Sequence, residues 1–357
     1  MMISYEEFRK SHSDYIRKKR LFIIACVAVT ILAVFLEIGT GKYEISFAYS
    51  MELFINHLIG VVPTDAQMAF DDSVVWDRVP TAIGGIGIGA MLGACGCAMQ
   101  SSMKNPLADP YLTGISSGAS LGVTLAGVLG FTLVSGLAYD TLVAINAFVF
   151  SLIPAAVMIF FTLFKKNMST SGVLLVGIAV MFMFNAFTTL LKYYAPESTV
   201  ADLYYWNVGS INPIDWDNYL LILASAAACI IILQFFSKKL NVLTLNDANV
   251  QTLGIDPRRI RTWLLILVSL FTAVAVCFTG TIGFIGLVAP HLCRMFLGSD
   301  NRYLLPASAM SGAMILLLSD CAAKLLTTGG LPSGVITALI GGPVFMFLLF
   351  KQRKSDW

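Results

Sequence analysis

Twenty consecutive residues without a charged side chain make up the stretch Thr81-Ala-Ile-Gly-Gly-Ile-Gly-Ile-Gly-Ala-Met-Leu-Gly-Ala-Cys-Gly-Cys-Ala-Met-Gln100. A membrane-spanning helix needs about 20 mostly apolar residues, so this stretch is long enough to cross a bilayer. Gly85, Gly89 and Gly93 recur every four residues along one helix face, which favours close packing against a second helix. A dinucleotide-binding fingerprint needs a preceding strand and a later acidic residue, and neither is present. The stretch therefore predicts a tightly packed membrane-spanning helix.

The whole chain has the composition of a membrane protein. Of its 357 residues 57% are hydrophobic and 12% are charged, and the mean hydropathy is +0.80. A water-soluble domain could not bury that much apolar surface. We expect an all-α integral membrane protein with about ten transmembrane helices. The expected spans are 20–38, 82–102, 112–131, 140–164, 171–192, 216–237, 260–279, 282–297, 304–326 and 333–350.

The spans form one continuous domain over residues 20–350, between an N-terminal tail at 1–19 and a C-terminal tail at 351–357. The first span follows the basic run 17–20 and could be mistaken for a signal peptide. Its apolar run continues to Leu36 without a small-residue cleavage site, so we interpret it as a retained helix.

Basic residues predict the orientation, because Lys and Arg in short loops remain on the cytoplasmic side. With ten spans, 19 of the 23 Lys and Arg residues fall on the side of both termini. We therefore expect a multi-pass protein of the cytoplasmic (inner) membrane with both termini in the cytoplasm. The four basic residues left outside are Lys42, Arg78, Lys192 and Lys324.

Several functions are excluded by missing motifs. The chain has no GxxxxGK[ST] phosphate loop, no nucleic-acid-binding motif and no paired carboxylates at one depth, so we expect neither an enzyme nor a bound cofactor. The seven cysteines lie in apolar spans without metal-ligand spacing, which indicates small buried side chains rather than a metal site. Asp320 is the one acidic residue well inside a span, and Lys324 one turn later predicts a local pair.

The longest cytoplasmic break, residues 238–259, is expected to contain a short exposed helix. Asn246 or Asp247 can cap its start, Gly254 can end it, and Asp256-Pro257 suits the start of the next helix. The break could be a connector or a docking element. On the outer side, a short amphipathic helix is expected near 46–58.

Three groups of motifs resemble the FecCD family of permeases. The first is Trp76-Asp-Arg-Val-Pro80, followed by Asn105-Pro-Leu-Ala-Asp-Pro110 and Gly114-Ile-Ser-Ser-Gly-Ala-Ser-Leu-Gly122. The second is Gly280-Thr-Ile-Gly-Phe-Ile-Gly-Leu-Val-Ala-Pro-His-Leu-Cys-Arg294, with Gly298-Ser-Asp-Asn-Arg302 and Leu305-Pro-Ala-Ser308. The third is Leu331-Pro-Ser-Gly-Val-Ile-Thr-Ala-Leu-Ile-Gly-Gly-Pro343. Together the resemblance covers about residues 20–350.

The resemblance implies the ten-helix permease subunit of a type II ATP-binding-cassette importer for iron(III)-siderophores, haem or cobalamin. Two copies or homologues would enclose the path, two ATP-binding subunits would dock inside, and a substrate-binding protein would dock outside. ATP and magnesium would be bound by the partner ATPase. An iron(III)-siderophore is the favoured substrate because the family mostly serves such complexes.

Site residues follow from matches to the family's positions. A coupling helix in the 238–259 loop would insert into the ATPase, and Arg78 and Lys324 would receive the binding protein, unless they only anchor their spans or neutralise Asp320. The coupling residues are Leu245, Asn246, Asp247, Ala248, Leu253 and Gly254. The residues matching the cytoplasmic gate are Asn105, Leu107, Thr170 and Ser171.

Polar, uncharged residues inside the fifth span suit the lining of a path that binds its cargo weakly. These candidates are Asn185, Thr188 and Thr189, although helix-to-helix hydrogen bonding would also explain them. An ion-coupled secondary transporter of a small solute is the alternative to the importer. It would work without an ATPase, so uptake measured with and without that partner separates the two.

Overall fold

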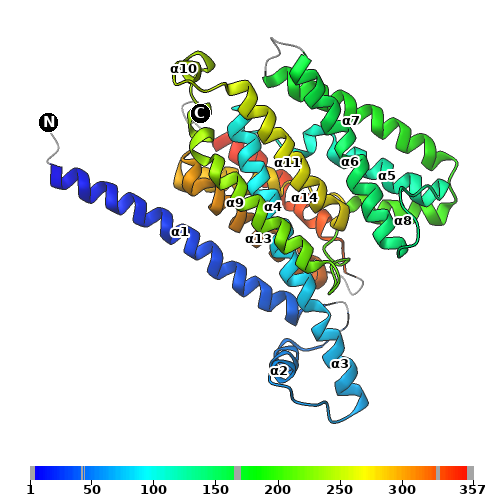
Figure 1. The fold of residues 1–357 in the computed structure, drawn as a ribbon. Helices are drawn as coiled ribbons and strands as arrows, with labels where there is room; N and C mark the ends of the chain where they lie inside the picture. The colour runs from blue at the N-terminus through cyan, green and yellow to red at the C-terminus, as the bar shows by residue number, and fades with distance from the viewer. Residues whose placement is uncertain (1–4, 42, 44, 165–169, 327–329, 352–357) are drawn as a thin grey trace.

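The chain folds into a bundle of helices (Figure 1), seen in a computed structural model that describes residues 5–41, 43, 45–164, 170–326 and 330–351. Every regular element in these ranges is helical. The elements are α1 (Tyr5–Gly39), α2 (Phe47–Leu58), α3 (Ala66–Trp76), α4 (Arg78–Met103), the 3-10 helix η1 (Pro110–Thr113), α5 (Ile115–Leu129), α6 (Tyr139–Phe164), α7 (Thr170–Tyr193), α8 (Glu197–Val208), α9 (Tyr219–Leu243), α10 (Asp247–Thr252), α11 (Pro257–Thr279), α12 (Ile285–Leu297), α13 (Asn301–Leu326) and α14 (Ser333–Lys351).

The ten expected spans each coincide with one of these helices. Seven are long and apolar enough to cross a membrane, and the other three are the shorter apolar helices α5, α12 and α14. Helix α12 is short because residues 280–284 interrupt the helical structure before it. Gly280 has φ 68° and Phe284, a non-glycine residue, has φ 69°. The sequence therefore predicted the all-α membrane fold correctly.

Helix α4 forms the centre of the bundle and is buried along almost its whole length, with α1, α9, α11, α12 and α13 packed around it. Its glycines make this possible. A Cβ atom built on Gly89 would lie 2.6 Å from the carbonyl oxygen of Gly312 and 2.6 Å from the Cα of Ala313 in α13. The expected glycine packing face is thus confirmed, with α13 as its partner.

A second group of helices, α5 to α8, lies beside this centre (Figure 1). Helix α11 joins the two groups, because it packs against α4 and α9 on one side and α5 and α6 on the other. Helix α8 was not expected, since its polar composition gave no apolar pattern; Leu203 is its one fully buried side chain.

A helical hairpin, α2 and α3, extends from one end of the bundle. Ser46 accepts a hydrogen bond from the Tyr49 amide at the start of α2, so the expected outer helix is confirmed. Helix α3 was not predicted, and it continues almost directly into α4 through Asp77. Leu53 and Val75 of the hairpin share a small core with Ile38 of α1 and with Val79 and Ala82 of α4.

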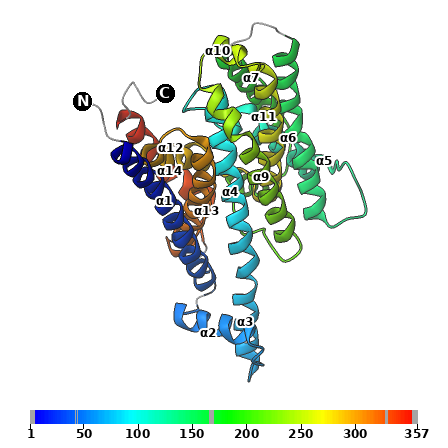
Figure 2. The same ribbon diagram turned by 60° about the vertical axis from the view of Figure 1, so that its left-hand side comes forward.

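The two ends of the bundle differ in charge. One end, the basic end, carries α10, the start of α1 and the end of α14 (Figure 2), with most of the Lys and Arg residues. The opposite, acidic end carries the α2–α3 hairpin (Figure 2). All seven cysteines are buried and unpaired, as expected for small apolar side chains.

Candidate functional site

The short helix α10 is fixed to the basic end by one carboxylate. The guanidinium of Arg261 donates two hydrogen bonds of 2.7 Å to Asp247, one to each oxygen, and Lys104 Nζ lies 3.0 Å from its Oδ1. Lys104 also donates to the carbonyl of Leu245, and Arg261 Nε donates to the carbonyl of Ser102. These contacts connect α10 to the ends of α4 and α11, and we name them the Asp247 clamp.

The carboxylate of Asp247 stays ionised over the physiological pH range. The hydrogen bond from Arg261 holds the pKa of Asp247 well below its usual range, and Lys104 adds to this effect. Because Arg261 binds both carboxylate oxygens of Asp247 in a bidentate pair, it also fixes the orientation of that side chain. The start of α10 is therefore held in one orientation.

Helix α10 buries one face against the bundle and exposes the other. Val250 is fully buried, whereas Leu245 and Leu253 are exposed. Asn246 precedes the helix with extended backbone, but its side chain makes no capping hydrogen bond; Gly254 follows it with φ 75°. Ala248 is also exposed. A short, rigid helix thus presents two leucines at the end of the bundle, which suits insertion into a partner's groove.

Polar contacts also fix the helices beside α10. Asn241, near the end of α9, accepts hydrogen bonds from the backbone and side-chain amides of Asn301 and donates to Asp300. Ser101 of α4 donates to Asn301 over 2.8 Å. Hydrogen bonds from Arg302 lower the pKa of Asp300 to about 2. The end of α9, which leads into α10, is therefore joined to both α13 and α4.

The residues predicted for the gate lie at this same end. Asn105 Oδ1 accepts a hydrogen bond from the Leu107 amide, which closes a turn directly after Lys104, and Leu107 is exposed. Thr170 begins α7, but its side chain and that of Ser171 lie outside the described residues. The gate assignment stays a prediction.

The predicted path residues lie on both faces of α7. Asn185 and Thr189 are exposed and Thr188 is buried. Each threonine hydroxyl donates to the carbonyl four residues earlier, Phe184 for Thr188 and Asn185 for Thr189. Both threonine hydroxyls therefore donate within α7 itself. Their role in a path stays a prediction.

Arg78 is buried, and the side chain of Lys324 is 6% exposed. Arg78 donates to the carbonyls of Ile38 and Tyr43 and so fixes the end of α1. Lys324 pairs with Asp320, 2.9 Å away, as the sequence predicted, and also with Glu37 of α1. Both cations therefore contact the end of α1, and their role in docking stays a prediction.

Two contacts between charged side chains were not predicted from the sequence. Glu37 lies 287 positions from Lys324, and Arg261 lies 14 positions from Asp247. Neither spacing corresponds to neighbouring positions on one helix, so no local pattern could have found them. A charged residue near the end of an apolar span, as Glu37 is, was the one available signal.

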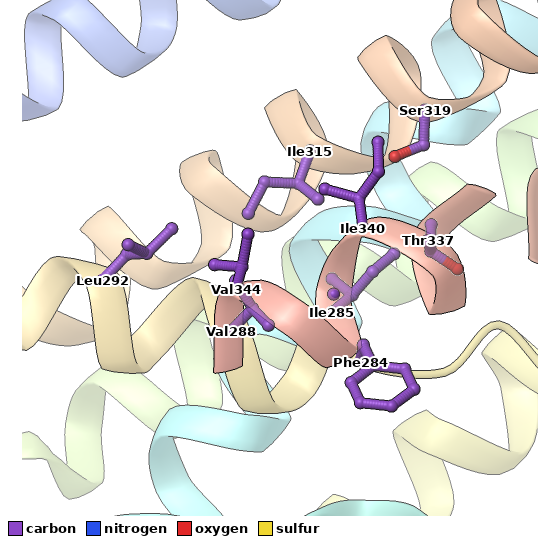
Figure 3. Close-up of a pocket in the computed structure, with 10 residues that line it drawn as sticks. Phe284, Ile285, Val288, Leu292, Ile315, Ser319, Thr337, Ile340 and Val344 are labelled. Atoms are coloured by element: carbon purple, nitrogen blue, oxygen red, sulfur yellow. The ribbon is translucent and has the colours of Figure 1, made fainter. Parts of the chain in front are cut away.

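An apolar crevice of about 120 Å³ lies between α12, α13 and α14 (Figure 3). Ile285, Val288, Ile315 and Ile340 line it, and the Phe284 ring stands at one side. Sites for drug-sized ligands occupy about 300–1,000 Å³, so this crevice is too small for a bulky chelate. Among the described residues no group of three or more His, Cys, Asp or Glu could hold a metal ion.

Ten apolar helices, five of them packed around the glycine-bearing α4, and a short helix clamped outside the bundle at its basic end define a multi-span membrane protein. The FecCD transport family matches residues 29–351, and the chain belongs to that family. It is therefore a permease subunit of the ATP-binding-cassette importer type.

Named relatives agree with this assignment. The chain is 34% identical over 295 residues to the vitamin B12 import system permease protein BtuC of Vibrio cholerae, covering 82% of this chain and 87% of that one. It is 37% identical over 281 residues to the hemin transport system permease protein HmuU of Yersinia pestis, covering 78% and 83%. A solved structure of a metal-chelate type ABC transporter in an inward-facing conformation matches with a TM-score of 0.78 and 26% identity, covering 94% of this chain and 100% of that one.

Proposed function

We propose that this chain forms, with a second copy or a homologue, the path of an importer that carries a metal chelate across the cytoplasmic membrane. Two ATP-binding subunits dock at the basic end, which faces the cytoplasm, and a substrate-binding protein docks at the acidic end. ATP and magnesium act in the partner subunits, and this chain changes conformation in response.

The single observation that carries the proposal is the geometry of α10. The Asp247 clamp and buried Val250 fix the helix, while Leu245 and Leu253 stay exposed. These two leucines flank the same short helix outside the membrane-spanning helices, so both are available for contact with another protein. A rigid helix transmits a partner's movement to the ends of α4 and α11 better than a flexible loop would.

The substrate class rests on the relatives. One is named for vitamin B12, one for hemin, and the solved structure is of metal-chelate type. An iron(III)-siderophore is our first candidate, followed by haem and cobalamin. Uptake of each, measured in proteoliposomes that contain this chain and its ATPase, identifies the cargo.

The docking role is tested with Leu253→Asp. A carboxylate in an apolar interface is costly, so we expect ATP-driven uptake to be lost while the protein still inserts into the membrane. Lys238→Asp, which places a carboxylate on an exposed position of α9, is the matched control and should transport normally. Normal uptake by Leu253→Asp would contradict the assignment of α10.

A proton-coupled secondary transporter would need a titratable group on its path. The buried cluster of Glu37, Asp320 and Lys324 is already internally paired, which does not favour an ion path. Uptake driven by an ion gradient without the ATPase would establish this alternative.

A further inference from the structure

Three charged side chains meet in the interior where the end of α1 packs against the end of α13 (Figure 2). Lys324 contacts Glu37 and lies 2.9 Å from Asp320 Oδ2. We name Glu37, Asp320 and Lys324 the Lys324 cluster. Their side chains are 0%, 1% and 6% exposed, respectively. The cluster contains two carboxyl groups but one ammonium group, so full ionisation would leave one buried negative charge in excess.

The other titratable groups near the cluster do not correct this imbalance. The Cys321 thiol donates to Glu37 Oε2 over 3.2 Å, which adds no charge. Arg78 of α4 acts on Glu37 only through space, because its guanidinium donates to the carbonyls of Ile38 and Tyr43. Among the described residues, α2, α3, α9, α12 and α14, which pack against α1 or α13, contribute no further titratable group to the cluster.

The oxygen atoms of the two carboxyl groups differ in their hydrogen bonds. Glu37 accepts from Lys324 at Oε1 and from Cys321 at Oε2. Asp320 Oδ1, in contrast, is buried without a hydrogen-bond partner in the part of the chain that the structure describes. The two carboxyl groups lie within hydrogen-bonding reach of each other. Ionised carboxylates only accept, so a hydrogen bond between them forms when one of them carries a proton.

We propose that the Lys324 cluster binds one proton, which Asp320 and Glu37 share and which holds the end of α1 against α13. With this proton bound, the cluster has one carboxylate, one ammonium group and no net charge. Without it, one buried negative charge remains uncompensated, which is costly in a low-dielectric interior. The proton exchanges with water at the acidic end, since Glu37 and Lys324 each lie two residues from the end of their helix.

Loss of the proton also affects the α2–α3 hairpin. Ile38, the residue after Glu37, shares a small core with Leu53 of α2 and Val75 of α3. An end of α1 that moves away from α13 therefore pulls on this core. The Lys324 cluster is in this way a pH-sensitive joint between the hairpin and the bundle.

Infrared spectroscopy of the purified chain tests for the proton directly, because a protonated carboxyl group and a carboxylate absorb at different frequencies. We expect the unaltered protein at neutral pH to show the band of one protonated carboxyl group that Glu37→Gln and Asp320→Asn both lack, since either variant leaves one carboxylate for Lys324. Glu52→Gln, which alters an exposed carboxyl group of α2, is the matched control and should keep the band. Equal protonated-carboxyl bands in the unaltered protein and both variants would overturn the proposal.

The dependence of stability on pH tests the binding of the proton a second time. The unfolded chain releases a carboxyl proton above about pH 4. The stability that the proton contributes is therefore complete below that pH and is lost as the pH rises to the point where the folded protein releases it. Within this interval the unfolding constant of the unaltered protein should rise about tenfold per pH unit relative to that of Glu37→Gln. Parallel pH curves for these two proteins would contradict proton binding, and Glu52→Gln should follow the unaltered protein.

A distance measurement tests whether the proton holds α1 in place. Spin labels are attached at Phe35→Cys of α1 and Leu318→Cys of α13, two exposed positions. The distribution of distances should be narrow while the protonated band is present and broader at the higher pH at which the band is lost. With Glu37→Gln added, it should stay narrow at both pH values. A distribution that does not change with pH in the chain that keeps Glu37 would show that the proton does not control the joint, and so would refute that part of the proposal.

Discussion

The contact between α4 and α13 predicts that one methyl group at Gly89 damages the bundle. In Gly89→Ala the new Cβ would lie 2.6 Å from the carbonyl oxygen of Gly312 and from the Cα of Ala313, whereas real Cβ contacts stay beyond 3.0 Å. Both neighbours are backbone atoms, so no side chain can rotate away. The helices must separate by about 0.5 Å, and such overpacking costs about 1–3 kcal/mol.

A matched control exists in α5. In Gly127→Ala the nearest atoms to the new Cβ would be 3.6 Å away, which is ordinary van der Waals contact. That substitution removes a flexible glycine from a helix, so it should leave stability unchanged or raise it by up to about 1 kcal/mol.

The assay is the free energy of unfolding of the detergent-purified protein, measured by denaturant titration. We expect Gly89→Ala to be less stable than the unaltered protein and Gly127→Ala to be at least as stable. Equal stability of Gly89→Ala and the unaltered protein would refute the close packing of α4 on α13.

Three further predictions concern charges and the gate. Asp247→Asn should lower the free energy of unfolding by about 1 kcal/mol, a value reduced for the solvent exposure of this carboxylate. Because the pKa of Asp247 is lowered on folding, this loss should be constant above about pH 5 and shrink as the pH falls through about 4. Denaturant titration at a series of pH values measures it. Lys324→Met leaves the carboxylates of Glu37 and Asp320 buried without a cation, so it should cost about 3–5 kcal/mol in the same titration. Adding Glu37→Gln should restore part of this loss, and no recovery would contradict the ion-pair explanation. Ser171→Cys should crosslink across two subunits in the closed state, and a lack of crosslinking in every nucleotide state would place the gate elsewhere.

Local patterns explain why the helices were predictable. Each membrane-spanning helix needs its own run of apolar residues, so ten runs predict ten spans whatever their arrangement. The residues that begin or end the short helices were local signals as well. Ser46 caps the start of α2 and Gly254 follows α10. Asp256 accepts hydrogen bonds from the backbone amides of Arg258 and Arg259 at the start of α11. The charge difference between the two ends is likewise a property of short loops.

The sequence by itself determined the ten membrane-spanning helices, the position of α10 and the glycine face of α4, because each depends on neighbours within a few turns; α3 and α8 were not predicted. Only the tertiary structure decided which partners the charged residues contact. Arg78 and Lys324 match outer docking positions in sequence, and only the structure shows that they also contact the end of α1, Arg78 through the Ile38 carbonyl and Lys324 through Glu37. Contacts such as Lys324 with Glu37 join segments from opposite ends of the chain, and no local spacing encodes which distant helix will lie alongside.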